Sequence, residues 1–172
     1  PENGTLTLST GVEGSAARMG HALTLEFEDW RATVDFNGET PVAVDLTIHV
    51  ASLQVVRASG GLKPLSDGDR RAIVKNAVGV LDAERQPTAS FTSTSLVPAG
   101  QQYTLSGSAT IAGVDSAAEV RVVAADAGDH WNVTAETTIR HSDFGLKPYS
   151  TMLGALRVSD AVQIVFEAAI GK

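Results

Sequence analysis

The sequence of 172 residues has no cysteine, which excludes disulfide scaffolds, thiol catalysis and cysteine zinc sites. It also has no clustered basic run, and its net charge is −7, so we expect neither nucleic acid nor an anionic membrane surface as its main partner. No apolar run is long enough to span a bilayer. The first four residues carry neither the basic nor the apolar region of a signal peptide. We therefore expect a cytoplasmic protein, or a periplasmic or secreted one if a signal peptide has been removed.

The overall composition is that of a protein that buries one core. Hydrophobic residues make up 43% of the chain and charged residues 19%, an ordinary balance for a soluble domain. A chain of this length can fold without disulfides or metals. We expect one domain over residues 1–172, and an apolar partner fits its charge better than a polyanion does.

Most of the chain alternates apolar and polar residues with the period of a half-buried β-strand. The clearest row covers residues 42–50, and similar rows cover residues 5–9, 21–36, 88–96, 103–111, 120–122, 131–139 and 162–168. Asp29 interrupts the phase of one row, and Asn37-Gly38 supplies a turn signal that fits φ > 0. About nine evenly spaced strands joined by short turns predict an antiparallel barrel or sandwich.

One segment has the period of a helix instead. Ser66, followed three residues later by Asp69, has the character of a capping box, and acidic residues suit the first turn of a helix. An apolar stripe at helical spacing follows: Ile73, Ala77 and Leu81. We expect this helix to connect two strands and to cover an apolar surface.

The hexapeptide Gly61-Leu62-Lys63-Pro64-Leu65-Ser66 returns with one change as Gly145-Leu146-Lys147-Pro148-Tyr149-Ser150. In each copy a glycine frees the backbone, a proline fixes φ and a serine can cap a helical turn. If both copies lie at one end of a barrel, they frame its mouth and place Lys63 and Lys147 near it. The alternative is a pair of ordinary turns whose lysines are solvated.

The apolar rows contain an unusual share of small residues: Ala32, Ala89, Ser93, Gly107, Ala109, Ala135 and Thr137. The interior of a barrel of about eight strands is either just filled by side chains or holds one small ligand. Small inward residues favour the ligand. The alternative is that these rows lie where two sheets pack closely, and the sequence does not separate the two.

Neither catalysis nor a resident metal is indicated. None of the four histidines has the close spacing of a metal pair, and only His21 and His141 merit a check as ligands. No Gly-x-Ser-x-Gly elbow is present. Ser142 and Asp143 beside His141 are interpreted as a turn that hydrogen-bonds itself.

Three ordered pieces of the sequence resemble the YceI-like family of bacterial lipid-binding proteins. They are residues 87–95 (PTASFTSTS), which follow the expected helix, residues 105–114 (LSGSATIAGV) and residues 140–145 (RHSDFG). The resemblance covers most of the chain from about Val44 onward. It implies an extended, lipocalin-like antiparallel barrel with a helix over it, and binding of a polyisoprenoid or similar amphiphile in the interior.

We therefore expect an all-β protein: an extended antiparallel lipocalin-like barrel of about eight strands, with a helix in a long crossover and a short helical lid segment. It would bind or carry a polyisoprenoid, an isoprenoid quinone or a fatty-acyl compound without covalent chemistry or any other cofactor. The residues expected to line or close the cavity are Phe27, Trp30, Phe36, Phe91, Leu105, Trp131 and Phe166. Those expected to form the lid are Phe144, Leu146, Tyr149, Met152 and Leu153. Lys63 or Lys147 would meet a polar or anionic head group.

Two other functions stay open. One is an enzyme that acts on a lipid-like substrate with His21 or His141 as base. The other is a structural or stress-related domain with a filled core and no ligand. An enzyme would turn over its lipid, a carrier would keep it intact, and a structural domain would copurify with nothing. A homodimer also stays open.

Overall fold

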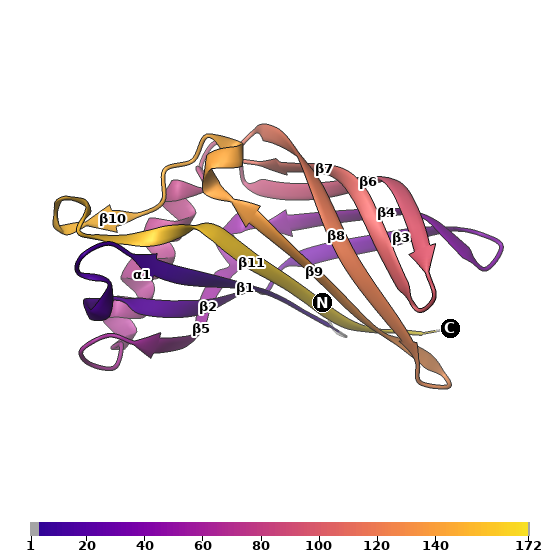
Figure 1. Cartoon of the computed structure of the whole chain (residues 1–172), viewed down its shortest axis with the longest axis horizontal. Coiled ribbons are helices and arrows are strands. Elements are labelled where there is room, and N and C mark those ends of the chain that lie inside the picture. Colours follow the sequence, from indigo (N-terminus) through magenta and orange to yellow (C-terminus); the bar gives the residue numbers. More distant parts are fainter. Residues whose placement is uncertain (1–3, 172) are drawn as a thin grey trace.

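The computed structural model describes residues 4–171, which form one curled antiparallel sheet and one α-helix (Figure 1). The strands are β1 (Gly4–Glu13), β2 (His21–Phe27), β3 (Trp30–Asn37), β4 (Thr40–His49), β5 (Leu53–Gly60), β6 (Thr88–Ala99), β7 (Gln102–Ile111), β8 (Val114–Asp126), β9 (His130–Arg140), β10 (Ser150–Thr151) and β11 (Leu156–Gly171). The helix is α1 (Asp67–Val80). Short 3-10 turns lie at Ala17–Met19, Val50–Ser52, His141–Phe144 and Met152–Gly154.

The strand order is β3-β4-β6-β7-β8-β9-β11-β1-β2-β5, and β10 pairs with β11 outside this path. Only two residues separate β2 from β3, and one 3-10 turn separates β4 from β5. When each of these pairs is taken as one bent ribbon, eight ribbons surround the interior in the described part of the chain. The predicted all-β, lipocalin-like barrel is confirmed, although the strands themselves number eleven.

The two bent ribbons meet at their bends through a small group of hydrogen bonds. The Asp29 N–H donates to Ser52 Oγ at 3.0 Å, and Ser52 Oγ donates to the His49 carbonyl at 2.7 Å. The His49 N–H donates to the Asp29 carbonyl at 2.9 Å. Because β3 and β5 are the two ends of the strand order, this junction brings those ends together. The break in alternation at Asp29 therefore marks a real break between strands.

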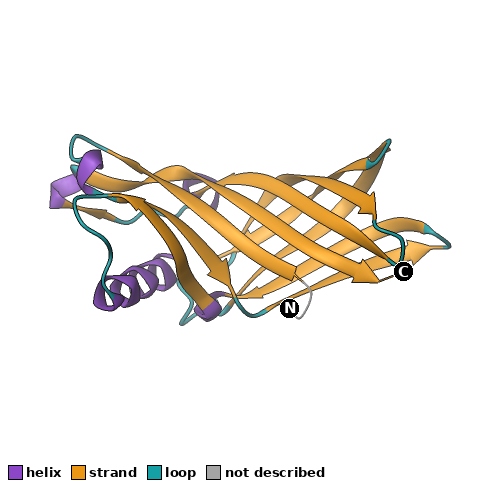
Figure 2. Cartoon of the chain, turned by 90° about the horizontal axis from the view of Figure 1, so that it is seen from below, coloured by secondary structure: helices purple, strands orange, loops and turns teal. Residues whose placement is uncertain are grey.

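The expected helix is confirmed as α1, and its first turn contains the predicted capping box. Ser66 Oγ accepts a hydrogen bond from the Asp69 N–H at 3.2 Å, and Asp69 Oδ2 accepts one from the Ser66 N–H at 2.9 Å. The Ser66 hydroxyl and N–H, with Lys63 and His21 nearby, lower the pKa of the Asp69 carboxyl. The apolar stripe of α1 packs against a buried cluster of the sheet. The helix thus lies beside the strands at one end of the molecule, while strands alone extend to the other (Figure 2).

Two buried clusters form the core. The first contains Leu6, Leu25, Phe27, Ile48, Val50, Leu53 and Ala89, and the second contains Phe91, Leu105, Ala109 and Phe144. Leu46 and Ile111 pack against both clusters. The core therefore continues from the helix side of the sheet toward β7 and β8.

The two ends of the molecule differ in construction. The loop end consists of residues 14–20, 60–65 and 149–156, and the hairpin end consists of the turns at residues 37–40, 99–102 and 126–130. At the loop end, the Ala16 N–H donates to the Ala155 carbonyl at 2.9 Å, and His21 lies opposite Gly60. The first copy of the repeated hexapeptide lies at this end, and the second reaches it at Tyr149. The short helical segment predicted after that second copy is not an α-helix: the strand β10 and a single 3-10 turn stand in its place.

No helix within residues 4–171 combines the length and the apolar character that crossing a membrane requires.

Candidate functional site: the interior of the curled sheet

The inward face of the sheet can be followed from the buried clusters along the cross-strand pairs. Residues opposite one another in an antiparallel pair point to the same face. Phe91 is opposite both Leu46 and Ala109, and Ala135 is opposite Phe166. Each of these residues is apolar, whereas their neighbours in sequence are mostly polar. Every ribbon therefore contributes alternate side chains to one apolar interior.

The interior beside the helix is filled. Trp30, the first residue of β3, and Phe166 on β11 meet edge to face, with ring centroids 5.0 Å apart and an angle of 77° between their planes. Both rings pack against the first buried cluster, which α1 also contacts through Ile73, Ala77 and Val78. No space for a large ligand is expected behind these two rings.

The second cluster is completed by the 3-10 turn that follows β9. Phe144 is only 3% exposed there. The Ser142 N–H and Oγ donate to the two carboxylate oxygens of Asp160, at 2.8 and 2.7 Å, and these bonds lower the pKa of Asp160. His141 Nδ1 donates to the Asp160 carbonyl at 3.0 Å. The turn hydrogen-bonds itself as predicted, because the Gly145 N–H donates to the Ser142 carbonyl at 3.2 Å and the Leu146 N–H to the His141 carbonyl at 3.0 Å. The Ser142 side chain also ties it to β11.

Gly107 shows why one of the small inward residues is small. A Cβ atom at this position would meet the carbonyl oxygen of Thr92 and would lie 2.8 Å from two atoms of the Phe91 ring. The Phe91 ring therefore occupies the space that the missing side chain leaves. At this position the small residue serves close packing rather than a cavity.

Toward the hairpin end the same inward face is exposed to solvent. Phe36, Trp131 and Ile170 expose 58%, 38% and 36% of their surface. Trp131 is opposite Ile170, and it shares a face with Ala135 four residues along β9. Apolar side chains on the core face of a sheet are normally covered. These inward side chains are therefore not covered at this end.

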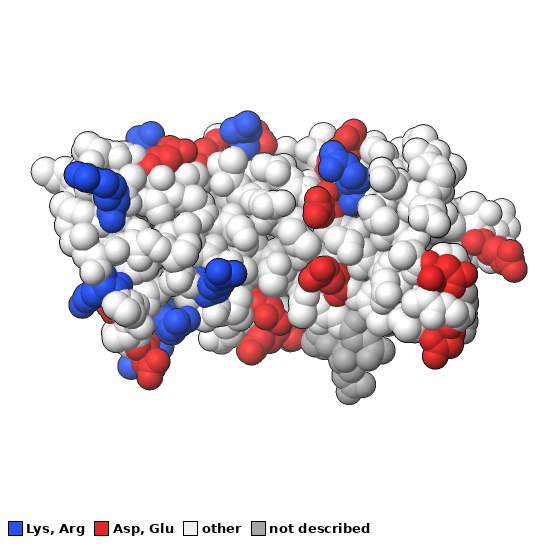
Figure 3. Space-filling view, turned by 60° about the horizontal axis from the view of Figure 1, so that its bottom comes forward, with Lys and Arg blue, Asp and Glu red and all other residues white. Residues whose placement is uncertain are grey.

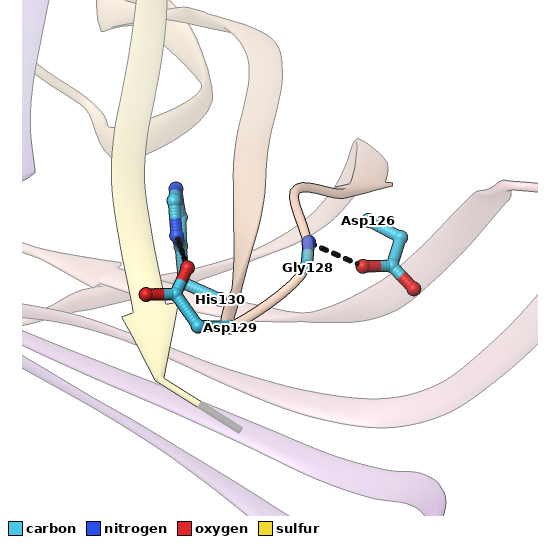
Figure 4. Close-up of polar contacts among 4 residues, drawn as sticks. All are labelled: Asp126, Gly128, Asp129 and His130. Atoms are coloured by element: carbon cyan, nitrogen blue, oxygen red, sulfur yellow. Dashed lines mark hydrogen bonds and ion pairs between the residues drawn. The ribbon is translucent and has the colours of Figure 1, made fainter.

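The turn between β8 and β9 forms part of the rim beside Trp131 (Figure 4). The Gly128 N–H donates to Asp126 Oδ1 at 2.8 Å, and His130 Nδ1 lies 2.6 Å from Asp129 Oδ1. Gly128 has φ +96°, which glycine adopts without strain. The rim at this end therefore combines two carboxylates with an apolar inward side chain.

A polar group without a partner also faces the interior. Thr10 Oγ1 is buried and has no hydrogen-bond partner among the described residues. Thr10 is opposite Val162 on β11 and Leu23 on β2. Leaving a buried hydroxyl unpaired costs about 1–3 kcal/mol. A polar atom of a bound molecule would satisfy this group.

A surface pocket of about 360 Å³ lies at the loop end, lined by His21, Arg70 and residues 58–65. His21 Nε2 donates to the Lys63 carbonyl at 2.9 Å, and Arg70 Nη1 donates to the Val55 carbonyl at 3.0 Å. The pocket thus has basic side chains around a main-chain framework that includes Gly60 and Gly61, both with positive φ.

The sequence model of the YceI-like domain matches residues 6–170. The chain belongs to the YceI-like family. The crystal structure of Burkholderia cenocepacia BcnA has the same fold, with a TM-score of 0.72, 22% identity, and coverage of 96% of this chain and 95% of that one. The crystal structure of a Campylobacter jejuni YceI protein gives a TM-score of 0.64 at 17% identity, and covers 86% of this chain and 84% of that one. No curated protein matches the chain.

In this YceI-like chain the predicted cavity residues share the inward face of the sheet: Phe27, Trp30, Phe36, Phe91, Leu105, Trp131 and Phe166. Phe27, Phe91 and Leu105 are packed in the core. Phe36 and Trp131 lie at the exposed end. The predicted set is therefore divided between the buried core and the exposed hairpin end.

The residues predicted as a lid lie in two places. Phe144 and Leu146 pack against the second buried cluster. Tyr149, Met152 and Leu153 are exposed at the loop end. Of the two head-group lysines, Lys63 lines the loop-end pocket and Lys147 is exposed on the segment between Phe144 and β10.

Sequence reasoning missed two inward residues. Ile170 continues the alternation of β11 that was followed only to Ala168, so the same period would have found it. Thr10 follows Leu6 and Leu8 in phase on β1, but its polar side chain gave no sign of an inward position. The sequence signalled the loop-end pocket only in part: the first hexapeptide copy lines it, but the approach of His21 and Arg70 to Lys63 depends on the fold.

The enzymatic alternative rests on His21 and His141. Within residues 4–171 no group of three His, Asp or Glu side chains could hold a metal ion. His21 and His141 each donate one ring N–H to a main-chain carbonyl. The Ser142 hydroxyl donates to the Asp160 carboxylate rather than to a histidine.

Proposed function

We propose that this protein binds a long apolar amphiphile in its interior and carries it unchanged. The observation that supports this proposal is the exposure of Phe36, Trp131 and Ile170 on the face that elsewhere forms the core. An apolar occupant would remove this surface from water, at about 25 cal/mol per Å². Polyisoprenoids, isoprenoid quinones and fatty-acyl compounds are suitable ligands because they offer a long apolar surface and few polar groups.

Family membership supports a binding role without catalysis, since YceI-like proteins are generally binding proteins rather than enzymes. We propose that the ligand leaves the protein with the same covalent structure that it had on entry. Apart from this ligand, the proposed function uses no cofactor.

An anionic head group would meet Lys63 at the loop-end pocket, with His21 and Arg70 beside it, if the apolar chain of the ligand displaces the Trp30 and Phe166 rings that fill the interior on that side. Lys147 is the second proposed contact for an anionic head group. On this proposal, Lys63→Ala weakens binding of an anionic amphiphile and leaves binding of the corresponding alcohol unchanged. Equal affinities of wild type and Lys63→Ala for both ligands would exclude Lys63 from the site.

The first test is native mass spectrometry of the purified protein, followed by organic extraction and identification of the released compound. We expect an intact isoprenoid or acyl chain at about one molecule per protein. A ligand-free mass, together with no rise in melting temperature on adding isoprenoid quinones or prenyl alcohols, would contradict the proposal. A chemically altered lipid after incubation would favour the enzyme instead.

A pair of matched variants tests whether the ligand lies in the interior. Ala32 is exposed on the inward face of β3, opposite Leu46, and Thr33 points to the outer face. Ala32→Trp should fill the interior and abolish copurification of the lipid, whereas Thr33→Trp should retain it. Circular dichroism of both variants controls for folding. Retention of the lipid in a folded Ala32→Trp variant would rule out the interior as its site.

A further inference from the structure

The loop end presents large apolar side chains to solvent. Leu153 is fully exposed, and Leu62 and Met152 are 75% and 50% exposed. Met19 and Tyr149 are about half exposed on the neighbouring segments. These residues come from the three chain segments that meet at this end, where Gly20 packs closely against Leu156 and Gly61 against the His21 ring. The apolar side chains therefore project from one end of the molecule.

The backbone that presents Met152 and Leu153 is unusual. Their φ angles are +52° and +56°, and Gly154 follows with φ +88°. Residues with a Cβ disfavour this left-handed region. The turn is held by hydrogen bonds from the Ala155 N–H to the Met152 carbonyl, at 3.1 Å, and from the Ala16 N–H to the Ala155 carbonyl. The fold thus maintains an unfavourable backbone that points two apolar side chains into water, which is typical of functional surfaces.

Basic side chains gather toward the same end of the molecule (Figure 3). Residues 13–21, 57–71 and 145–157 contain seven of the thirteen Lys and Arg residues of the chain but only three of its twenty acids. The seven are Arg18, Arg57, Lys63, Arg70, Arg71, Lys147 and Arg157. One of them, Arg157, is paired with Glu13 at 3.2 Å, whereas no described residue forms an ion pair with Arg18, Lys63 or Lys147.

The hairpin end has the opposite charge. Its turns contain Asp35, Glu39, Asp126 and Asp129 within or beside them, and residues 34–41, 97–103 and 125–131 contain no Lys or Arg. In Figure 3 the charged side chains visible at that end are Asp and Glu. The net charge of −7 conceals this separation. A ten-residue strand spans roughly 33 Å, which is several times the Debye length of about 8 Å at physiological salt. The negative charge of the hairpin end is therefore screened at the loop end and hardly opposes binding of an anionic partner there.

We propose that the loop end docks on an anionic bilayer surface. Leu153, Met152 and Leu62 enter the interfacial layer, and Arg18, Lys63 and Lys147 lie at the level of the lipid phosphates. This combination of apolar tips and flanking cations is what binds peripheral proteins to anionic membranes. The acidic hairpin end points away from the surface, so the long axis of the molecule stands up from the membrane.

Charge also argues against a second copy of the chain as the occupant. Two loop ends facing each other would bring like charges together around the apolar contact, which opposes association. An anionic lipid surface supplies the complementary charge. This inference does not depend on a ligand in the interior, because Leu62, Met152 and Leu153 lie outside the buried clusters. It shares only Lys63 and Lys147 with the proposed function, so the dye at position 153 tests the two proposals separately.

Because the chain has no cysteine, a single environment-sensitive dye can be attached at chosen positions. Leu153→Cys places it at the loop end, and Val97→Cys, at a residue 57% exposed near the hairpin end, is the matched control. With vesicles of 30% phosphatidylserine and 70% phosphatidylcholine, we expect a blue shift and a rise in emission at position 153 and none at 97. No shift at 153, or equal shifts at both positions, would overturn the proposal.

Vesicle flotation of unlabelled protein measures the charge contribution. Lys63→Glu with Lys147→Glu should lower partitioning more than tenfold, since each cation near the surface contributes about fivefold. Arg31→Glu with Arg121→Glu, at exposed positions on β3 and β8, should change it little. Leu153→Ser should lower it about tenfold. Equal binding to vesicles of pure phosphatidylcholine and to vesicles that contain phosphatidylserine would contradict docking on an anionic membrane. So would a concentration-dependent dimer that the Leu153→Ser substitution dissociates, because the apolar residues would then serve self-association.

Discussion

The Trp30 and Phe166 rings meet edge to face, 5.0 Å between centroids, although β3 and β11 are not neighbours in the strand order. The contact therefore ties together two parts of the sheet that no ladder of backbone hydrogen bonds joins. Beyond Trp30, the next inward residues of β3, Ala32 and Val34, are not buried. The ring pair marks the boundary between the packed interior beside α1 and the inward face that is exposed toward the hairpin end.

A double-mutant cycle tests this contact. Trp30→Ala and Phe166→Ala should each lower the free energy of unfolding by about 3 kcal/mol, as for large aromatic truncations in cores. Their effects should fall short of additivity by about 1 kcal/mol, which is typical of an edge-to-face pair. Urea unfolding at neutral pH provides all four values. Strict additivity would mean that the rings do not interact in solution.

Gly107 and Gly79 should respond with opposite signs to the same substitution. Gly107→Ala forces the Phe91 ring and the Thr92 carbonyl to move, and overpacking of this kind costs about 1–3 kcal/mol. Gly79 lies in α1 with open space around its Cα, so Gly79→Ala should raise stability by about 1 kcal/mol. Thermal unfolding measures both, and a neutral Gly107→Ala would contradict the close approach of Phe91.

The Asp160 carboxylate should make the stability of the protein depend on pH in the acidic range. Its hydrogen bonds from Ser142 lower its folded pKa below the usual 3.8, so their stabilisation is complete above the unfolded pKa and is lost as pH falls through the folded pKa. Asp160→Asn should therefore lower the unfolding midpoint by more at pH 6 than at pH 3, which lies below the usual pKa of 3.8. Asp143→Asn, on the same turn, is the matched control. A deficit of equal size at both pH values would show that the ionised carboxylate is not the group that matters.

Thr10→Val should stabilise the protein by about 1 kcal/mol, because it removes a buried hydroxyl without a partner and keeps the shape of the side chain. Thr7→Val on the same strand provides the comparison, since Thr7 Oγ1 donates to the Val165 carbonyl at 3.4 Å and no gain is expected there. Chemical denaturation of the lipid-free protein is the measurement. A loss of stability in Thr10→Val would reveal a hydrogen bond that this account lacks.

Much of the interior was predictable from period-two alternation. Trp131 and Phe166 could be placed inward because a buried face repeats at every second residue and the alternation is unbroken through β9 and β11. The capping box at Ser66 was equally clear, because caps depend on residues only three positions apart. Local rules therefore sufficed for the strands, the helix and most of the inward face.

Contacts between distant segments were not predictable. Ser142 pairs with Asp160 because β9 and β11 are neighbours, a relation with no local signal. The exposed turn at Met152 and Leu153 was expected as a helix, since its apolar residues have helical spacing and nothing marks a left-handed backbone in residues other than glycine. The separation of charge between the two ends likewise depends on the fold and cannot be read from a net charge.

The most direct test of the central claim uses Trp131, because this residue is inward-facing, partly exposed and one of only two tryptophans. In a Trp30→Phe variant, Trp131 alone reports on the interior. Titration of the lipid-free variant with geranylgeraniol should shift its emission to the blue, protect it from acrylamide quenching and saturate near one ligand per protein. Emission and quenching that stay unchanged at saturating ligand would contradict a lipid-binding interior.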